Sequence, residues 1–260
     1  MIIDDDTREL LLAAARNNAE WCDAVCRGHG PGGAFSPGAW TSAHRTPPLY
    51  PDAVTLTPEA SAEALLAGID TGSPGGCSVK DSFAVLDLVP AGFEVLFEAR
   101  WIHHPAPAAA PSRLEWSEVA TAGELEAWEA AWDGEESTGL FHPALLGGDS
   151  RGNTGGNTGG NTDGDTGAGS GRDIVFLAGR AGDRIVAGAV ANRTGSVVGV
   201  SNLFAHDDAD ADAAWAGALS GIAARWPGLP VVGYEHGDDL DAALRNGFTD
   251  LGPLRVWLRT

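Results

Sequence analysis

Three consecutive residues whose side chains can transfer protons follow a short apolar run near the C-terminus. The run is Leu229–Tyr234, and its last residue, Tyr234, is followed by Glu235 and His236. A carboxylate or an imidazole can take a proton from an amine, and a tyrosine hydroxyl can give one to a leaving group. We therefore name Glu235 and His236 as candidate bases and Tyr234 as a candidate acid. Polar residues at the end of a strand also begin loops and cap helices, so a structural role stays open.

A second group of titratable side chains lies in the acidic segment His206–Ala213. It contains four aspartates, at positions 207, 208, 210 and 212. The last three match the first ligand positions of a calcium loop, but Ala213 stands where such a loop has glycine and Leu219 where it has glutamate. Acidic residues are also favoured at helix N-termini by the helix dipole. We predict no metal site here.

Other reactive residue types give little support for chemistry. Cys22 and Cys26 lie within a predicted helix, and no second pair of cysteines completes a zinc site. The histidines are not spaced as metal ligands. None of Ser36, Ser42 and Ser82 lies in the Gly-x-Ser-x-Gly turn of a nucleophilic hydrolase. Trp40, Lys80 and Asp81 are candidates to reach a cleft between domains.

Composition limits the partners that the protein can bind. The 260 residues are 43% hydrophobic, which is enough for an ordinary core, and 36 acidic against 16 basic residues give a net charge of −20. This charge argues against nucleic acids and anionic membranes and favours a cationic small molecule. The first residues are acidic where a signal peptide is basic, and no apolar run reaches the roughly eighteen residues of a membrane span. We expect a cytoplasmic protein and infer no oligomeric state.

The last third of the chain reads as one continuous series of strands and helices. Period-two patterns, turns and helical spacing predict strand, strand, strand, helix, strand, helix, strand. The strands and the first helix are expected at Asp173–Arg180, Arg184–Asn192, Ser196–Ala205, Ala213–Trp226, Leu229–Tyr234 and Leu251–Arg259, and the second helix ends at Asn246–Gly247. The first three strands are expected to form an antiparallel meander.

This order resembles the C-terminal part of the GNAT superfamily of N-acetyltransferases. Three places carry the resemblance: the strand Val200–Ala205, the helix after it, and Leu244–Phe248, which is similar to the family's Gly-Phe before the final strand. Counted from a first strand and helix at Leu114–Trp132, the resemblance spans about half of the chain. It implies transfer of an acetyl or related acyl group from acetyl-CoA to a small amine.

The resemblance also implies where the coenzyme would bind. The parallel strands Ser196–Ala205 and Leu229–Tyr234 would separate and admit the pantetheine arm of acetyl-CoA, and the helix after the first would point its N-terminus at the pyrophosphate. The implied coenzyme-binding residues are Asn202, Leu203, Phe204, Ala205, Ala211 and Ala213.

The sequence departs from the family pattern in two places, the phosphate loop and the position of the tyrosine acid. The family's phosphate loop has arginine or glutamine and glycines, where this sequence has Asp210, Ala211 and Ala213, and its frequent tyrosine acid falls on Ala243. Aspartates at a phosphate site repel the ligand. A relative that keeps the fold but is catalytically silent, or uses the cleft for other chemistry, is therefore the alternative to acyl transfer.

The first part of the chain is expected to form a smaller α+β domain. Residues 1–104 carry a long helix at Thr7–Arg27, a short helix at Glu59–Ile69 and strands that include Cys77–Leu88 and Phe93–His103. Their order suggests a shortened copy of the acetyltransferase half, and an unrelated α+β domain is the alternative. We place a stiff linker at 105–111 and the acetyltransferase-like domain at 112–260. The whole is predicted to be an α/β protein with a mixed sheet.

A Gly/Asn/Thr tract, 149–172, interrupts the second domain. It offers almost no apolar side chain, and we expect a flexible insertion. Its four-residue repeat does not match the nine-residue turn of calcium-binding β-rolls.

Overall fold

The computed structural model describes residues 5–134, 136–147, 173–206 and 210–260. The Gly/Asn/Thr tract and Asp207 and Asp208 of the acidic segment lie outside them.

The predicted meander is present. Strands β7 (Ile174–Ala181), β8 (Arg184–Thr194) and β9 (Val197–Ala205) pair antiparallel in succession. Gly182 and Gly195 make the two turns with φ values of 61° and 56°, a backbone conformation that glycine adopts without steric cost. Most of β8 is buried because helices cover both faces of the sheet.

One helix of this part begins where its capping residues predict, and the helix expected to begin at Ala213 begins two residues earlier, after its N-cap Asp210. Thr121 and Glu124 form the expected reciprocal capping box at α3 (Ala122–Asp133). Helix α4 (Ala211–Arg225) follows β9, and α5 (Gly237–Arg245) lies between β10 (Val231–Glu235) and β11 (Thr249–Arg259). Strand β6 (Glu115–Glu118) precedes α3, and a short 3₁₀ helix, η2 (Pro143–Leu146), follows it.

In the first hundred residues the long helix is confirmed as α1 (Asp5–His29). Strands β1 (Ala34–Phe35), β2 (Ala39–Thr41) and β3 (Ala53–Thr55), helix α2 (Ala62–Leu66), strand β4 (Cys77–Asp81), the 3₁₀ helix η1 (Val89–Ala91) and strand β5 (Glu94–His104) follow it.

Two expected boundaries in this region were too wide. Helix α2 begins only after its N-cap Ser61, whose hydroxyl accepts a hydrogen bond from the Ala64 amide. Strand β4 ends at Asp81 instead of Leu88, because the Asp81 carboxylate accepts hydrogen bonds from the amides of Phe83 and Leu86 and turns the chain.

Both parts of the chain build one sheet. Its eleven strands lie in the order β1-β2-β3-β4-β11-β5-β10-β9-β8-β7-β6. The last strand of the chain, β11, lies between β4 and β5 and pairs antiparallel with both. The fold is thus a mixed α/β sheet as predicted, whereas a separate N-terminal domain, or a copy of the acetyltransferase half, is not shown. The boundary at 105–111 stays a prediction.

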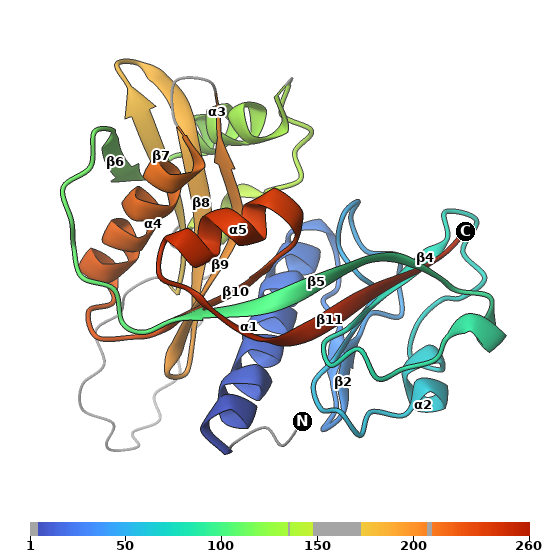
Figure 1. Ribbon diagram of the computed structural model, residues 1–260. Coiled ribbons are helices and arrows are strands. Elements are labelled where there is room, and N and C mark those ends of the chain that lie inside the picture. The colour runs from blue at the N-terminus through green and yellow to red at the C-terminus, as the bar shows by residue number, and fades with distance from the viewer. Residues whose placement is uncertain (1–4, 135, 148–172, 207–209) are drawn as a thin grey trace, which may run out of the picture.

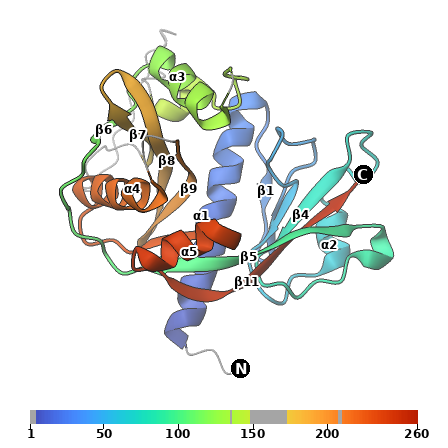
Figure 2. The same ribbon diagram turned by 45° about the horizontal axis from the view of Figure 1, so that its top comes forward.

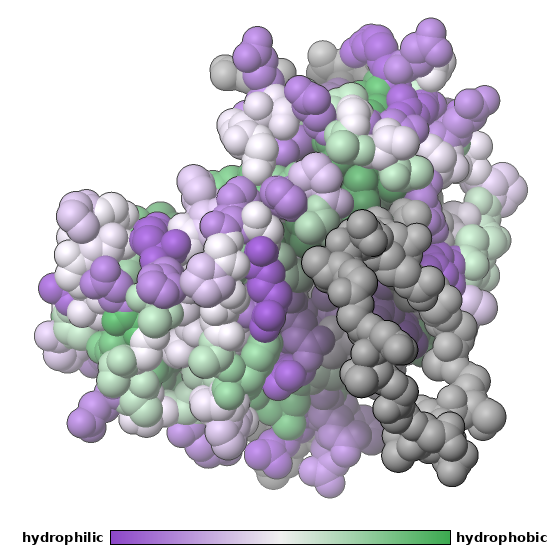
Figure 3. All heavy atoms as spheres, turned by 180° about the vertical axis from the view of Figure 1, so that it is seen from behind, coloured by the Kyte–Doolittle hydropathy of each residue, from purple (hydrophilic) through white to green (hydrophobic). Residues whose placement is uncertain are grey.

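Helices cover the sheet on two faces. Helix α1 lies behind β5 and β11 in Figure 1, and α4 and α5 lie in front. One core joins α1 and α3 to β7 and β8, and another joins α4 and α5 to β7–β10. Figure 2 shows α1 between the β6–β9 side and the β4, β5 and β11 side of the sheet. On the face seen from behind, hydrophobic residues occur in small groups among hydrophilic ones (Figure 3).

Candidate functional site

Strands β9 and β10 separate at their carboxyl ends. They pair in parallel only where Val231 faces Val198 and Val232 faces Gly199. From Gly233 onward, β10 stays paired with β5, while β9 stays paired with β8. An opening between two neighbouring parallel strands results, as the resemblance implied.

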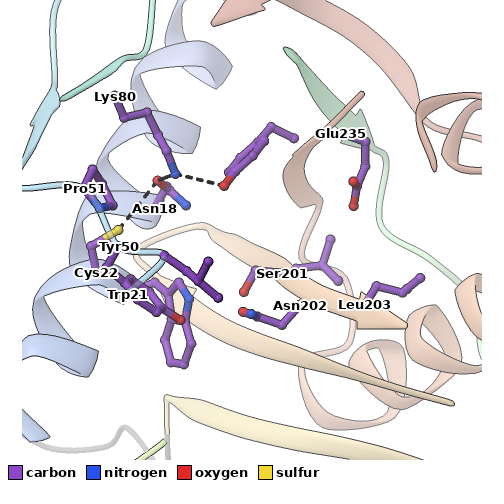
Figure 4. Close-up of a pocket in the computed structure, with 13 residues that line it drawn as sticks. Asn18, Trp21, Cys22, Tyr50, Pro51, Lys80, Ser201, Asn202, Leu203 and Glu235 are labelled. Atoms are coloured by element: carbon purple, nitrogen blue, oxygen red, sulfur yellow. Dashed lines mark hydrogen bonds between the residues drawn. The ribbon is translucent and has the colours of Figure 1, made fainter. Parts of the chain in front are cut away.

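A pocket of about 190 Å³ lies at this opening. Its wall combines side chains from both parts of the chain (Figure 4). The lining residues are Asn18, Trp21 and Cys22 of α1; Leu49, Tyr50 and Pro51 of the loop before β3; Lys80 of β4; Val200, Ser201, Asn202 and Leu203 of β9; and Tyr234 and Glu235 of β10.

Helix α1 reaches the pocket because a glycine in β9 lets it approach. The Asn17 side chain donates a hydrogen bond to the Asn192 carbonyl, at 2.9 Å, and the Asn192 side chain donates one to the Asn17 carbonyl, at 3.3 Å. A Cβ atom on Gly199 would lie 1.8 Å from the Asn17 Oδ1. This close contact fixes the height of α1 over the sheet and turns the next residue, Asn18, toward the pocket.

Lys80 forms the centre of a buried polar cluster. Its Nζ donates hydrogen bonds to Asn18 Oδ1, at 2.8 Å, and to Tyr234 Oη, at 3.0 Å. The same ammonium lies 4.2 Å from the centroid of the Tyr234 ring. The contacts orient Tyr234, because a hydroxyl oxygen that accepts from Lys80 directs its own proton elsewhere.

Of the three predicted acid–base residues, the structure places two at the pocket. Tyr234 and Glu235 line it, whereas His236 is exposed, stands at the N-cap position of α5 and packs its ring 5.4 Å from that of Phe97. Burial, and to a smaller extent the nearby Asp239 carboxylate, raises the pKa of Glu235 to about 8. A carboxyl group with such a pKa is suited to proton transfer near neutral pH.

The β9 residues divide between the pocket and the core. Asn202 has φ 51°, at a bulge where β9 gains a residue relative to β8, and with Leu203 it lines the pocket. Phe204 instead packs 5.3 Å from the Trp128 ring on the α3 side, and Ala205 pairs with Ala187.

Ala211 and Ala213, implied as coenzyme-binding residues of the loop before the helix, both lie in the first turn of α4. Asp210 is the N-cap, and its carboxylate accepts a hydrogen bond from the Ala213 amide at 2.6 Å. Asp212 pairs with Arg245, at 3.1 Å, and accepts from the Asn246 side chain. The described aspartates of the acidic segment therefore stabilise the start of α4 and its contact with α5.

Among the N-terminal candidates only Lys80 lines the pocket. The Trp40 indole donates to Asp23 in the core, and Asp81 caps the turn after β4. Cys22 lines the pocket as a thiol, because burial raises its pKa against the opposing effect of Lys80.

Sequence reasoning missed Asn18, Tyr50 and Ser201 as pocket residues. A signal for Asn18 was present: two adjacent asparagines interrupt the apolar face of the predicted helix Thr7–Arg27. The sequence also has a single lysine, placed within an apolar strand. Lys80 was named, but its partners were not.

The part of the chain that the structure describes contains neither a candidate metal site nor a candidate membrane-spanning helix. Within it, no group of three or more His, Cys, Asp or Glu residues is arranged to hold a metal ion. No helix there is long and apolar enough to cross a membrane.

Solved structures share this fold. A GCN5-related N-acetyltransferase from Kribbella flavida matches with a TM-score of 0.59 and 16% identity, over 95% of this chain and 95% of that chain. A protein assigned to the GNAT acetyltransferases from Novosphingobium aromaticivorans matches with a TM-score of 0.54 and 16% identity, over 94% and 97%. No family model and no curated protein matches the sequence. The chain has the fold of the GNAT N-acetyltransferases, which confirms the resemblance at the level of fold.

Proposed function

We propose that this protein transfers an acyl group from coenzyme A to a small amine. The observation that carries the proposal is the opening between β9 and β10, with a pocket whose wall includes Tyr234 and Glu235. Fold alone does not establish function, so the proposal depends on the residues at this opening.

The opening fits the pantetheine arm of the coenzyme. The facing edges of the two strands are no longer paired with each other beyond Gly199 and Val232, so their backbone groups are available to amide groups of a ligand. We assign the pantetheine contacts to the β9 edge near Asn202 and Leu203. Phe204 and Ala205, also implied by the resemblance, would support this edge from behind.

The start of α4 fits the pyrophosphate less well. The Ala213 amide is already bonded to Asp210, and two carboxylates stand in the first turn and its cap. Ala211 and Ala213 would be the nearest backbone positions to the phosphates. We expect weaker coenzyme binding than an arginine- and glycine-containing loop would provide.

In the proposed reaction Glu235 takes the proton from the attacking amine. The raised pKa leaves part of its carboxyl population deprotonated near neutral pH and makes the deprotonated form a stronger base. Tyr234 gives a proton to the departing thiolate, because Lys80 occupies the oxygen as a donor and leaves the hydroxyl proton free to point into the pocket. His236 is exposed and has no role in this scheme. It is the alternative base if Glu235 does not take the proton.

A second candidate is a protein that keeps the fold without coenzyme A chemistry. Asp210 and Asp212 favour it, and so does Ala243, which is fully buried in the core between α5 and the sheet and leaves no titratable group there.

An acyl-transfer assay with a panel of small amines tests the proposal. Acetyl-CoA is incubated with the protein, and both free thiol and acetylated amine are measured, with Glu235→Gln as the matched control. We expect equal amounts of both products with the natural protein and loss of both with the variant. Thiol release without acetylated amine, or no release at all, would favour the second candidate.

A further inference from the structure

Lys80 is a buried cation that has no counter-ion among the residues that the structure describes. It is the only lysine in the sequence, and it is 4% exposed. Its two hydrogen bonds go to an amide oxygen, that of Asn18, and to the hydroxyl of Tyr234. In the part of the chain that the structure describes, no carboxylate lies within 4.0 Å of Nζ. Since buried charges in proteins are normally paired, an anionic ligand beside this ammonium would supply the opposite charge that its neutral partners lack.

The third hydrogen of the ammonium is available for such an anion. An ammonium carries three donor hydrogens, and Asn18 and Tyr234 accept two of them. Lys80 also lines the pocket at the β9–β10 opening. A ligand there would therefore meet a positive charge with a free donor.

A buried hydroxyl group in the same pocket makes no hydrogen bond. Ser201 Oγ has no partner among the described residues, and Ser201 lines the pocket with Lys80 and Tyr50. Burial raises the pKa of Tyr50 well above its ordinary value, against a smaller opposing effect of a hydrogen bond with the Trp21 side chain, so the Tyr50 hydroxyl stays protonated and can donate to a ligand. Because buried polar groups are nearly always bonded, the unpaired Ser201 hydroxyl points to a ligand in this pocket.

We infer that the acyl acceptor carries a carboxylate, and that this carboxylate binds the Lys80 ammonium together with the hydroxyls of Ser201 and Tyr50. A carboxylate accepts several hydrogen bonds and carries the charge that Lys80 lacks. The inference rests on the proposed function in one respect, since it takes the ligand of this pocket to be the acceptor amine.

The amine and the carboxylate of this acceptor would face different walls. Lys80 and Glu235 lie on opposite sides of the pocket in Figure 4. A molecule with an amine at Glu235 and a carboxylate at Lys80 is an amino acid. The net charge of −20 attracts the cationic amine from solution, and Lys80 supplies the local positive charge that accepts the acid end.

Because Lys80 is the only lysine, isotope labelling of lysine reports on this site alone. The labelled protein is titrated, without coenzyme A, with glycine, β-alanine and 4-aminobutyrate, which place the two charges at increasing separation. Glycinamide and β-alaninamide serve as controls without a carboxylate. We expect a saturable NMR shift of the Lys80 side chain with at least one acid and none with the amides. If no acid shifts the resonance, the inference is wrong.

Two variants show whether the named groups hold the acid. Lys80→Met removes the charge with little change of volume, and Ser201→Ala removes a hydroxyl without a protein partner, so it should not disturb folding. Binding of the acid, measured by calorimetry, should weaken by about tenfold or more in each, since hydrogen bonds to charged groups are among the stronger ones. Unchanged affinity in a folded Ser201→Ala variant and in Lys80→Met would contradict the assignment.

Acyl-transfer kinetics separate this role from one in the chemical step. Because Lys80 also orients Tyr234, Lys80→Met should lower kcat for every acceptor and, in addition, raise KM for the acid more than KM for the matching amide. Ser201→Ala removes a hydroxyl without a protein partner and should raise KM for the acid more than KM for the amide, with little change of kcat. If neither variant changes KM for the acid more than KM for the amide, the inference fails. Carboxylate binding without any acyl transfer would instead refute the proposed function and leave the anion site standing.

Discussion

Lys80 Nζ lies 3.0 Å from Tyr234 Oη, a contact between strands β4 and β10 that are 154 positions apart in the chain. The hydrogen bond crosses the wall of the pocket and joins the part of the sheet built by the first hundred residues to the strand that carries the proposed acid and base. Its consequence is that Tyr234, the proposed acid, depends on the N-terminal part of the chain for its orientation.

Tyr234→Phe tests this dependence. The variant keeps the ring that faces the ammonium but loses the hydroxyl, so kcat should fall by roughly 10²-fold or more, the usual contribution of a general acid. The chain has one other tyrosine, and Tyr50→Phe is the matched control. That variant should raise KM for a carboxylate acceptor while kcat stays close to the natural value. If Tyr234→Phe retains full kcat, Tyr234 is not the acid.

The pH dependence of acyl transfer follows from Glu235. A base with a pKa of about 8 is mostly protonated at neutral pH, so kcat/KM should rise with pH and level off above about 8. Asp239→Asn removes the smaller cause of the raised pKa and should move this limb to lower pH. Glu235→Gln should abolish it. A pH profile that is identical in the natural protein and Asp239→Asn would contradict the assignment of the limb to Glu235.

The same residue affects stability, and the sign can be worked out. The pKa of Glu235 is raised from its ordinary value of 4.5 to about 8 in the folded protein. Between these values the folded state holds a proton that the unfolded state has lost, so stability falls as pH rises through this window and then levels off. Denaturant unfolding of Glu235→Gln should lack this contribution. The stability of the variant relative to the natural protein should therefore increase from pH 5 to pH 8. A constant difference would refute the raised pKa.

The start of α4 limits coenzyme binding in this account, and the triple variant Asp210→Arg, Ala211→Gly, Ala213→Gly should relieve it. An arginine replaces a carboxylate that repels phosphate, and glycines let the backbone approach closely, so affinity for coenzyme A should rise by about tenfold or more. Loss of the Asp210 cap and glycine in the first turn should lower stability by about 1–3 kcal/mol.

Asp210→Asn is the control for that experiment. Asparagine caps helices as well as aspartate does, so the single variant removes the charge and keeps the cap. We expect an intermediate gain in affinity with little loss of stability. A folded triple variant with unchanged affinity for coenzyme A would show that the first turn of α4 does not meet the phosphates, and the second candidate function would gain support.

Local patterns were sufficient to predict most elements of the C-terminal part. The β7–β9 meander follows from alternating residues and glycine turns, and the capping box at Thr121 and Glu124 was readable as a four-residue motif. The sequence did not predict that β11 lies between β4 and β5, because strand order depends on pairing between residues that are far apart in the sequence.

For the same reason, the sequence predicted the β10 residues of the candidate site but not the residues that other elements contribute. Tyr234 and Glu235 belong to the element that ends at the opening, and their position in sequence identified them. Asn18 and Lys80 reach the pocket because α1 docks against Gly199 and β4 joins the sheet through β11. Tyr50 lies in the loop before β3, which pairs with β4. His236 was predicted as a site residue only because it follows Glu235 in the sequence. Consecutive side chains at the end of a strand point in different directions, so His236 does not reach the pocket.

Calorimetric titration with acetyl-CoA tests the central claim, that the opening between β9 and β10 holds the pantetheine arm. Adenosine 3′,5′-bisphosphate, which lacks that arm, is the comparison ligand. We predict saturable binding of acetyl-CoA in the micromolar range and much weaker binding of the bisphosphate. Absence of heat with millimolar acetyl-CoA, or equal binding of the two ligands, would contradict the claim.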